Sequence, residues 1–363
     1  MQAMRILQIC SARDIGGGER HLADLANTLS RRGHDVFAAV RSGSRLRAEL
    51  RSLPPENIIE LPMRNSLNLA SAVKLSRFVR QQHIDIVHAH VARDYPLAAL
   101  AAGRSKARLV LTRHVLFPLN RVHRLTLRRT ARVIAVSQAV AESLYSRRIF
   151  AAEKIVTIHN GIDVEKFASA GHDRGHSGKL RVGTVGHLGP IKGLANFVRA
   201  AAIACANRDD LEFIIAGEDK SPSRENGLAL EKLIGELKVA HAVKLVGWVD
   251  NVATLLSTLD LFVSAARSEP FGLAIVEAMA AGVPVVATAS EGAREIIEDK
   301  QTGRLVPINN IEAMTTAIID LLNDRAAANR LADNARIRVH ENFSLDKTVQ
   351  RTEQVYTDAM TGK

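Results

Sequence analysis

The feature that most constrains this chain is a regular alternation of short aliphatic runs with amphipathic stretches, which pauses near residue 170 and then restarts. Runs of Val, Ile, Leu and Ala are typical of parallel strands buried on both faces, and stretches such as Glu19–Arg32, Leu69–Gln82 and Gln138–Arg148 have helical periodicity. The expected strands are Arg5–Cys10, Asp35–Val40, Ile58–Leu61, Asp85–Val91, Arg108–His114, Arg132–Ser137 and Lys154–His159, then Leu180–Gly186, Leu211–Gly217, Val243–Val249, Leu261–Ala266, Val283–Thr288 and Arg304–Val306. This pattern predicts an α/β fold built from two tandem Rossmann-like domains.

The pause in the alternation indicates where the domains meet. Residues 168–179 are small and polar and have no apolar period, which is typical of a linker. We therefore expect a first domain over residues 1–170, a linker over 171–179, a second domain over 180–343 and a C-terminal helix over 344–363 that returns to the first domain. Two doubly wound domains in tandem predict a ligand cleft between the carboxyl ends of their sheets.

Composition excludes several classes of protein. A hydrophobic share of 47% is too high for a disordered chain. No segment approaches the ~18–20 apolar residues of a membrane span, so we expect any membrane contact to be peripheral. Cys10 and Cys205 lie far apart in apolar surroundings, which predicts reduced thiols and a cytoplasmic location.

The positive charge is concentrated in one half of the chain. Residues 1–175 hold 28 Lys and Arg against 14 Asp and Glu, a net charge of +14, whereas the remainder has −3. This asymmetry indicates a polyanionic partner of the first half, either nucleic acid, anionic lipid or an acidic glycan. A solvated, arginine-rich surface without a partner is the alternative.

The stretch 267–287 carries the most chemical information. Glu269 precedes a Pro-Phe-Gly turn, Gly272 begins an expected helix that ends near Ala281, and Glu277 follows one to two turns into it. The start of a helix offers free N–H groups to an anion. Glu269 is suited to accept hydrogen bonds from sugar hydroxyls, and Glu277 to accept two from the vicinal hydroxyls of a ribose.

This stretch resembles glycosyltransferase family 4, whose hallmark is two Glu separated by seven residues and followed by Ala-Met-Ala and Gly-x-Pro-Val-Val-Ala. The resemblance covers nearly the whole chain. It implies the GT-B fold and a retaining transferase that uses a nucleoside-diphosphate sugar. Phe271, Gly272, Leu273 and Glu277 then become donor-binding candidates. The alternative is a helix start with two solvated Glu.

Two further segments resemble the donor-binding half of the family. Residues 185–193 are similar to a Gly-Arg-Leu…Lys-Gly turn in which Arg and Lys grip the donor diphosphate. Lys192 matches the Lys, but His187 stands where Arg is usual, and a neutral imidazole does not replace a guanidinium fork. Residues 214–218 and 243–251 resemble strands beside the nucleoside pocket and contribute Gly217 and Val249 as candidates.

The first half contains two segments that the resemblance places near the reacting groups. Gly16, Gly17 and Glu19 match the family's Gly-Gly-x-Glu-Arg entry, which faces the donor phosphates and the acceptor. Residues 112–114 resemble its Thr-x-His motif, whose histidine, here His114, lies close to the transferred sugar.

We expect neither a metal nor a cofactor. His88, His90 and His114 fall near strand ends, but no Asp, Glu or Cys accompanies them at metal-ligand spacing. The resemblance implies that the leaving diphosphate accepts the acceptor's proton. Lys192 and the helix start at Gly272 would stabilise that diphosphate, while Glu269 and His114 hold the sugar. The donor is expected to be a UDP-sugar or GDP-mannose.

The acceptor is indicated only by basic residues. Arg121, Arg124, Arg128 and Arg132 repeat at three and four, which predicts one helical face, with Leu116 and Phe117 just before it. Such a face suits the anionic inner surface of the cytoplasmic membrane, at ~1 kcal/mol per basic residue. We therefore expect an envelope glycan or lipid-linked acceptor.

Two alternatives remain. One is a GT-B enzyme that acts on a soluble acceptor or epimerises a nucleotide sugar. The other is a basic binding protein without catalysis. A nucleic-acid partner is not expected, because the sequence has no recognition helix, aromatic platform or zinc spacing.

Overall fold

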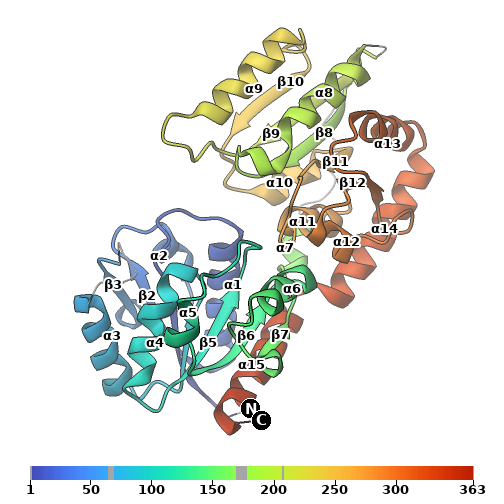
Figure 1. Ribbon diagram of the computed structural model, residues 1–363. Coiled ribbons are helices and arrows are strands. Elements are labelled where there is room, and N and C mark those ends of the chain that lie inside the picture. The colour runs from blue at the N-terminus through green and yellow to red at the C-terminus, as the bar shows by residue number, and fades with distance from the viewer. Residues whose placement is uncertain (1, 64–68, 169–177, 207, 363) are drawn as a thin grey trace. The chain divides into compact units, whose positions relative to one another are not determined.

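The computed structural model describes residues 2–63, 69–168, 178–206 and 208–362, and the chain divides into two compact units (Figure 1). The first unit comprises Met1–Ile162 together with Leu345–Lys363, and the second comprises Asp163–Ser344. Of the expected linker over 171–179, only Gly178 and Lys179 lie within the described residues. None of the helices in the described ranges combines the length and apolar character needed to cross a bilayer.

The first unit is built on a seven-stranded sheet in the order β3-β2-β1-β4-β5-β6-β7, and all its pairings are parallel. The strands alternate with helices that follow them in the chain, as the sequence pattern predicts. The strands are β1 (Arg5–Cys10), β2 (Asp35–Arg41), β3 (Ile58–Leu61), β4 (Ile86–Ala89), β5 (Arg108–Arg113), β6 (Thr130–Ala135) and β7 (Ile155–Thr157). The helices are α1 (Gly17–Arg31), α2 (Leu46–Glu49), η1 (Pro55–Asn57), α3 (Leu69–Gln81), η2 (Ala92–Asp94), α4 (Tyr95–Gly103), α5 (His123–Thr126), α6 (Gln138–Arg147) and η3 (Ala152–Lys154).

The last helix, α15 (Leu345–Thr361), belongs to the first unit, which confirms the predicted return of the C-terminus. In Figure 1 this red helix lies beside the green strands of the first sheet, and its buried Val349, Val355 and Tyr356 belong to the same hydrophobic core as the buried residues of α1. Its buried Glu353 accepts two hydrogen bonds from Arg32, at 2.9 and 3.0 Å. Helix α15 is therefore held on the first unit by apolar packing and by a charged hydrogen-bonded pair.

The second unit repeats the plan with a six-stranded parallel sheet in the order β10-β9-β8-β11-β12-β13. Its strands are β8 (Leu180–Val185), β9 (Leu211–Ala216), β10 (Val243–Gly247), β11 (Leu261–Ser264), β12 (Val285–Thr288) and β13 (Arg304–Val306). Its helices are α7 (Val164–Ala168), η4 (Pro190–Lys192), α8 (Leu194–Cys205), α9 (Glu225–Glu236), α10 (Val252–Ser257), α11 (Leu273–Ala280), α12 (Glu291–Ile296), α13 (Ile311–Asn323) and α14 (Arg325–Asn342). Asn251, Asn310 and Asp324 cap α10, α13 and α14 through side-chain oxygens, because these residues satisfy N–H groups that have no partner within the helix.

Each sheet reverses its strand order at one place. In the first unit the reversal lies between β1 and β4, and in the second between β8 and β11. Doubly wound folds bind ligands beside the carboxyl ends of the strands at such a reversal. The loops that follow β1, β4, β8 and β11 are therefore the segments in which to look for a site.

Candidate active site

In the second unit, the loops after β8 and β11 bring together two of the predicted catalytic residues. Lys192 ends η4 and Glu269 precedes α11, and the distance from Lys192 Nζ to Glu269 Oε2 is 2.5 Å. The two side chains are only 23% and 14% exposed, so solvent screens this ion pair weakly. A cation and a carboxylate are thus paired beside the point where the strand order of the second sheet reverses.

Glycines allow these loops to approach closely. A Cβ on Gly193, whose φ is +64°, would lie 2.0 Å from the carbonyl oxygen of Ala265. A Cβ on Gly217 would lie 1.8 Å from the carbonyl oxygen of Gly186. Because only glycine fits at both positions, the backbone after β8 lies directly against the ends of β9 and β11. These close contacts hold the backbone at Lys192 in place, and so fix where its side chain begins.

The start of α11 provides a group that can bind an anion. Gly272 occupies the left-handed region with φ at +118°, and no side chain caps the helix among the described residues. The Glu269 backbone just before it is fixed, because its carbonyl accepts from the N–H of Gly292 at 2.8 Å. The N–H groups at this start and the helix dipole are available to a negatively charged ligand.

Glu277 lies in the second turn of α11 and is 7% exposed. Solvent screens a buried carboxylate weakly, so a charged hydrogen bond that it accepts from a ligand is strong. The side chain of Phe271 lies in the core, where it is 3% exposed and its ring packs edge-on against Phe343. Leu273, the first residue of α11, is half-buried.

His187 and Val249 lie in different surroundings. His187 is exposed, and its pKa is lowered, first by partial desolvation and then by the charges of Lys192 and Lys220. Lys220 is a cation near this loop that the sequence reasoning missed. Val249 lines a groove of about 570 Å³ on the face of the sheet beside α10, together with Ile214, Val246 and Leu255.

In the first unit, the glycine-rich segment after β1 contacts His114, the predicted catalytic histidine. The contact is made by Gly18, which was not among the predicted site residues. A Cβ on Gly18 would lie 3.3 Å from Cγ of His114, so the ring packs directly against the first turn of α1. Glu19 turns back onto its own helix and accepts from the N–H of Gly16 at 2.9 Å. Its carboxylate thus caps α1 in the structure, while Gly17 is the first residue of that helix.

A buried polar network surrounds His114. The Nδ1 atom of His90 lies 3.4 Å from Nε2 of His114, and Nε2 of His90 lies 2.8 Å from the Gln8 side-chain oxygen. His88 contacts Tyr356 Oη and Thr112 Oγ1, both at 2.7 Å. Desolvation lowers the pKa of each of these histidines, so all three rings are neutral at pH 7.

The prediction that Arg121, Arg124, Arg128 and Arg132 share one helical face is wrong. Helix α5 spans only His123–Thr126, Arg128 lies in the following turn, and Arg132 is half-buried in β6. The segment Thr130–Ala135 is rich in β-branched residues and pairs with both β5 and β7, so sheet formation ends the helix.

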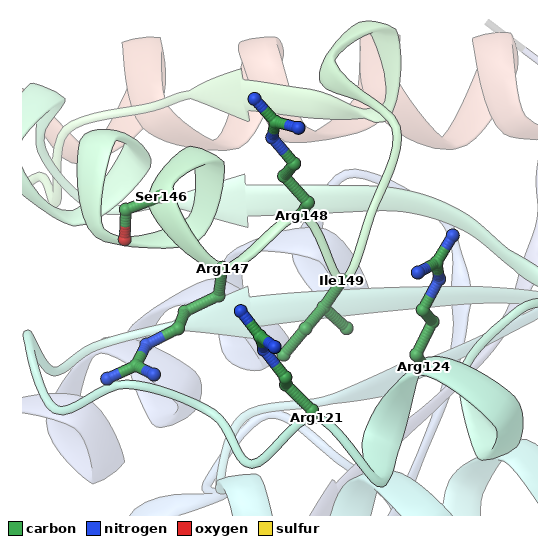
Figure 2. Close-up of a pocket in the computed structure, with 6 residues that line it drawn as sticks. All are labelled: Arg121, Arg124, Ser146, Arg147, Arg148 and Ile149. Atoms are coloured by element: carbon green, nitrogen blue, oxygen red, sulfur yellow. The ribbon is translucent and has the colours of Figure 1, made fainter.

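Two of those arginines instead join two others around a cavity of about 470 Å³. Figure 2 shows Arg121 and Arg124 on the segment through α5, facing the end of α6 with Arg147 and Arg148. Large apolar side chains are exposed on the same segment: Phe117 at 67%, Val122 at 67% and Leu125 at 78%. Basic and apolar groups therefore share one surface of the first unit.

Two family models match this chain, and together they cover most of it. Residues 15–166 match the model described as Glycosyltransferase Family 4, and residues 173–338 match the one described as Glycosyl transferases group 1. The chain is a family 4 glycosyltransferase with the GT-B fold.

Known relatives agree with this assignment. This glycosyltransferase is 25% identical over 375 residues to N-acetyl-alpha-D-glucosaminyl L-malate synthase of Bacillus anthracis, covering 95% of each chain. It is 28% identical over 361 residues to phosphatidyl-myo-inositol mannosyltransferase of Mycolicibacterium smegmatis, covering 93% of this chain and 89% of the relative. Its fold matches Anabaena HepE, solved with UDP and glucose, with a TM-score of 0.84 at 23% identity over 98% of this chain and 99% of HepE.

Proposed function

We propose that this glycosyltransferase moves a sugar from a nucleoside-diphosphate donor with retention of configuration and without a metal ion. The observation that carries the proposal is the Lys192–Glu269 pair next to the uncapped start of α11. A cation, a carboxylate and free helix N–H groups are the groups that a diphosphate and its attached sugar require.

Lys192 is the main ligand of the diphosphate in this proposal. Its ammonium has three N–H donors, so it can bind phosphate oxygens while it keeps one hydrogen bond to Glu269. Glu269 has a second oxygen with which to accept from a sugar hydroxyl. The pair would therefore place the sugar and the leaving group relative to each other.

The second phosphate contact is assigned to Lys220, with His187 as a neutral donor. Partial desolvation, followed by the charges of Lys192 and Lys220, lowers the pKa of the His187 imidazole, which favours the neutral ring at pH 7. A neutral imidazole donates one hydrogen bond but carries no charge. Lys220 would supply the charge that an arginine at position 187 would otherwise bring.

The proposed step breaks the bond from the anomeric carbon to the diphosphate oxygen and forms a bond to the acceptor hydroxyl oxygen on the same face. The hydroxyl proton passes to the leaving diphosphate. Lys192 and the start of α11 stabilise the charge that develops on the diphosphate, and no metal is required for it. Glu277 would bind the ribose hydroxyls of the donor, and His114 would contact the transferred sugar.

The acceptor is proposed to be an envelope glycan or lipid-linked acceptor that is met at the anionic inner face of the cytoplasmic membrane. The support is the surface that carries Arg121 and Arg124 beside Phe117 and Leu125, where basic and exposed apolar groups coincide. Two relatives have anionic compounds in their names, L-malate and phosphatidyl-myo-inositol. Equal binding to anionic and neutral vesicles would indicate a soluble anionic acceptor in place of a membrane-bound one.

A hydrolysis screen tests the donor assignment. UDP-, GDP- and ADP-sugars are incubated without acceptor, and the released nucleotide and the anomer of the sugar are followed by NMR. We expect one donor, a UDP-sugar or GDP-mannose, to be hydrolysed slowly with retention. Lys192→Ala should abolish this activity, while Lys232→Ala on an exposed face of α9 should not. Inversion of the anomer would refute the retaining mechanism.

Metal independence is tested by chelation. Because Lys192 and the helix start provide the positive charge at the diphosphate, an excess of EDTA should not lower the rate of donor hydrolysis. Loss of activity that Mg²⁺ or Mn²⁺ restores would show that a metal bridges the diphosphate.

A further inference from the structure

Three histidines of the first unit come together from three separate segments. His21 lies in α1, His90 follows β4 and His114 follows β5. One ring nitrogen from each lies within 4.8 Å of the other two. His21 and His90 are buried, at 5% and 4% exposure, and His114 is half-buried. The sequence reasoning considered His88 in this role, but both nitrogens of that ring already have partners.

The spacing of the nitrogens matches the coordination of a small cation. Nδ1 of His90 and Nε2 of His114 are 3.4 Å apart, which is long for a hydrogen bond between two nitrogens. Zinc binds imidazole nitrogen at ~2.0–2.1 Å, so two ligands of a tetrahedral zinc are about 3.4 Å apart. The two rings are therefore already at the separation that a shared ion requires.

The hydrogen bonds behind His90 orient its ring for this purpose. Gln8 donates from Nε2 to Tyr356 Oη at 3.3 Å, which directs its carbonyl oxygen toward His90. That oxygen accepts from Nε2–H of His90, which leaves Nδ1 unprotonated and directed at the cluster. A histidine that ligates a metal typically donates its other N–H to such an acceptor.

Two of the three rings also have an unsatisfied polar atom. Nδ1 of His21 and Nδ1 of His114 are buried without a hydrogen-bond partner within the described residues. A buried nitrogen without a partner is costly unless something else satisfies it. A cation bound among the rings would take a lone pair from one nitrogen of each ring. At His114 the nitrogen that faces His90 is Nε2, so the unsatisfied atom that supports an ion here is Nδ1 of His21.

We propose that His21, His90 and His114 form a binding site for one zinc ion, with a fourth coordination position that is open to water. Three neutral imidazoles without a carboxylate favour zinc and neighbouring late first-row cations over Mg²⁺ or Ca²⁺, which prefer oxygen ligands. This site is separate from the diphosphate site of the second unit and does not depend on it.

One consequence rests on the proposed function. If His114 contacts the transferred sugar, a zinc ion on that ring places positive charge beside an oxocarbenium-like transition state and raises its energy. Bound zinc is then an inhibitor of a reaction that itself needs no metal. The experiment measures metal binding and not sugar transfer, so failure of the transfer proposal would leave the binding result interpretable.

The experiment uses the full chain without a histidine tag, freed of metal by a chelator and titrated with Co²⁺. We expect one equivalent to bind with the visible absorption bands of four-coordinate cobalt, and Zn²⁺ to displace it. His21→Gln and His90→Gln should each lower cobalt affinity more than about tenfold. His241→Gln, which removes an exposed histidine of the second unit, should leave the titration unchanged.

Absence of these bands in the wild-type chain, or their persistence in both variants, would overturn the proposal. Because the variants alter buried positions, circular dichroism checks that they fold. Should they fail to fold, wild-type crystals soaked in zinc decide the question: an anomalous peak among the three rings supports the site, and its absence refutes it.

Discussion

Gly193 is the residue on which the geometry of the Lys192–Glu269 pair depends most directly. A methyl group there would lie 2.0 Å from the carbonyl oxygen of Ala265, and the φ of +64° is itself unfavourable for other residues. We expect Gly193→Ala to destabilise the second unit by at least about 2 kcal/mol, because both the backbone contact and the left-handed conformation are lost. Thermal unfolding followed by circular dichroism measures the effect.

Gly235 provides the matched control. It lies inside α9, and a Cβ there would meet no atom within 4 Å. Replacing a helical glycine by alanine stabilises by up to about 1 kcal/mol. Gly235→Ala should therefore raise the melting temperature slightly. If both variants behaved alike, the close approach at Gly193 would not determine stability.

The buried carboxylate of Glu277 should contribute to donor binding. We expect Glu277→Ala to weaken binding of the donor nucleotide by about 1.5–3 kcal/mol, because charged hydrogen bonds to the ribose are lost. This corresponds to a dissociation constant roughly ten- to 150-fold higher, measurable by calorimetry. Glu231→Ala, an exposed residue of α9, serves as the control. Normal nucleotide affinity in Glu277→Ala would exclude the ribose assignment.

The candidate site was predictable from sequence where one continuous motif carries it. Glu269, Gly272 and Glu277 belong to a single stretch, and Lys192 to a second, so each could be named as a candidate from a motif that is continuous in the sequence. Gly18 and His21 were missed, because their contacts with His114 depend on how α1 packs beside the ends of β4 and β5. No local pattern distinguishes them from ordinary helix residues.

At the scale of elements, each expected strand is present in the structure, and the boundaries differ by a few residues. Buried parallel strands are predictable because their aliphatic runs are short and separated by helices. The basic segment near residue 121 was misjudged, since arginines spaced by three and four fit a helix, whereas Thr130–Ala135 forms a central strand. Pairing with both neighbouring strands overrides that local spacing.

Helix α15 gives the next prediction. The hydroxyl of Tyr356 is fully buried and contacts both Gln8 and His88 from a distant part of the chain. Tyr356→Phe should lower the stability of the first unit by about 1–3 kcal/mol, because two buried polar groups lose a partner. Tyr145→Phe, at a residue that is 40% exposed, should change it little. Chemical denaturation measures both, and equal midpoints would argue against an anchoring role for this hydroxyl.

For the whole molecule, the distribution of charge is the property that no single element explains. The first half of the chain has a net charge of +14, yet its basic residues do not follow one helix. Four of them gather around one cavity because α5 lies near the end of α6 (Figure 2). The tertiary structure thus brings together arginines that are separated in the sequence, and it places them near exposed apolar side chains.

This concentration gives the final prediction, which concerns the membrane. Replacing Arg121, Arg124, Arg147 and Arg148 with Gln should weaken binding to anionic vesicles strongly, since each basic contact contributes about 1 kcal/mol. A control removes equal charge from exposed positions of the same unit outside the cavity, with Gln at Arg77, Arg80, Arg104 and Lys106. Binding should fade as salt rises, because the contacts are screened. Sedimentation with anionic and neutral vesicles measures it. Equal loss in both variants would mean that overall charge acts without a defined site, and equal binding to both vesicle types would favour a soluble acceptor.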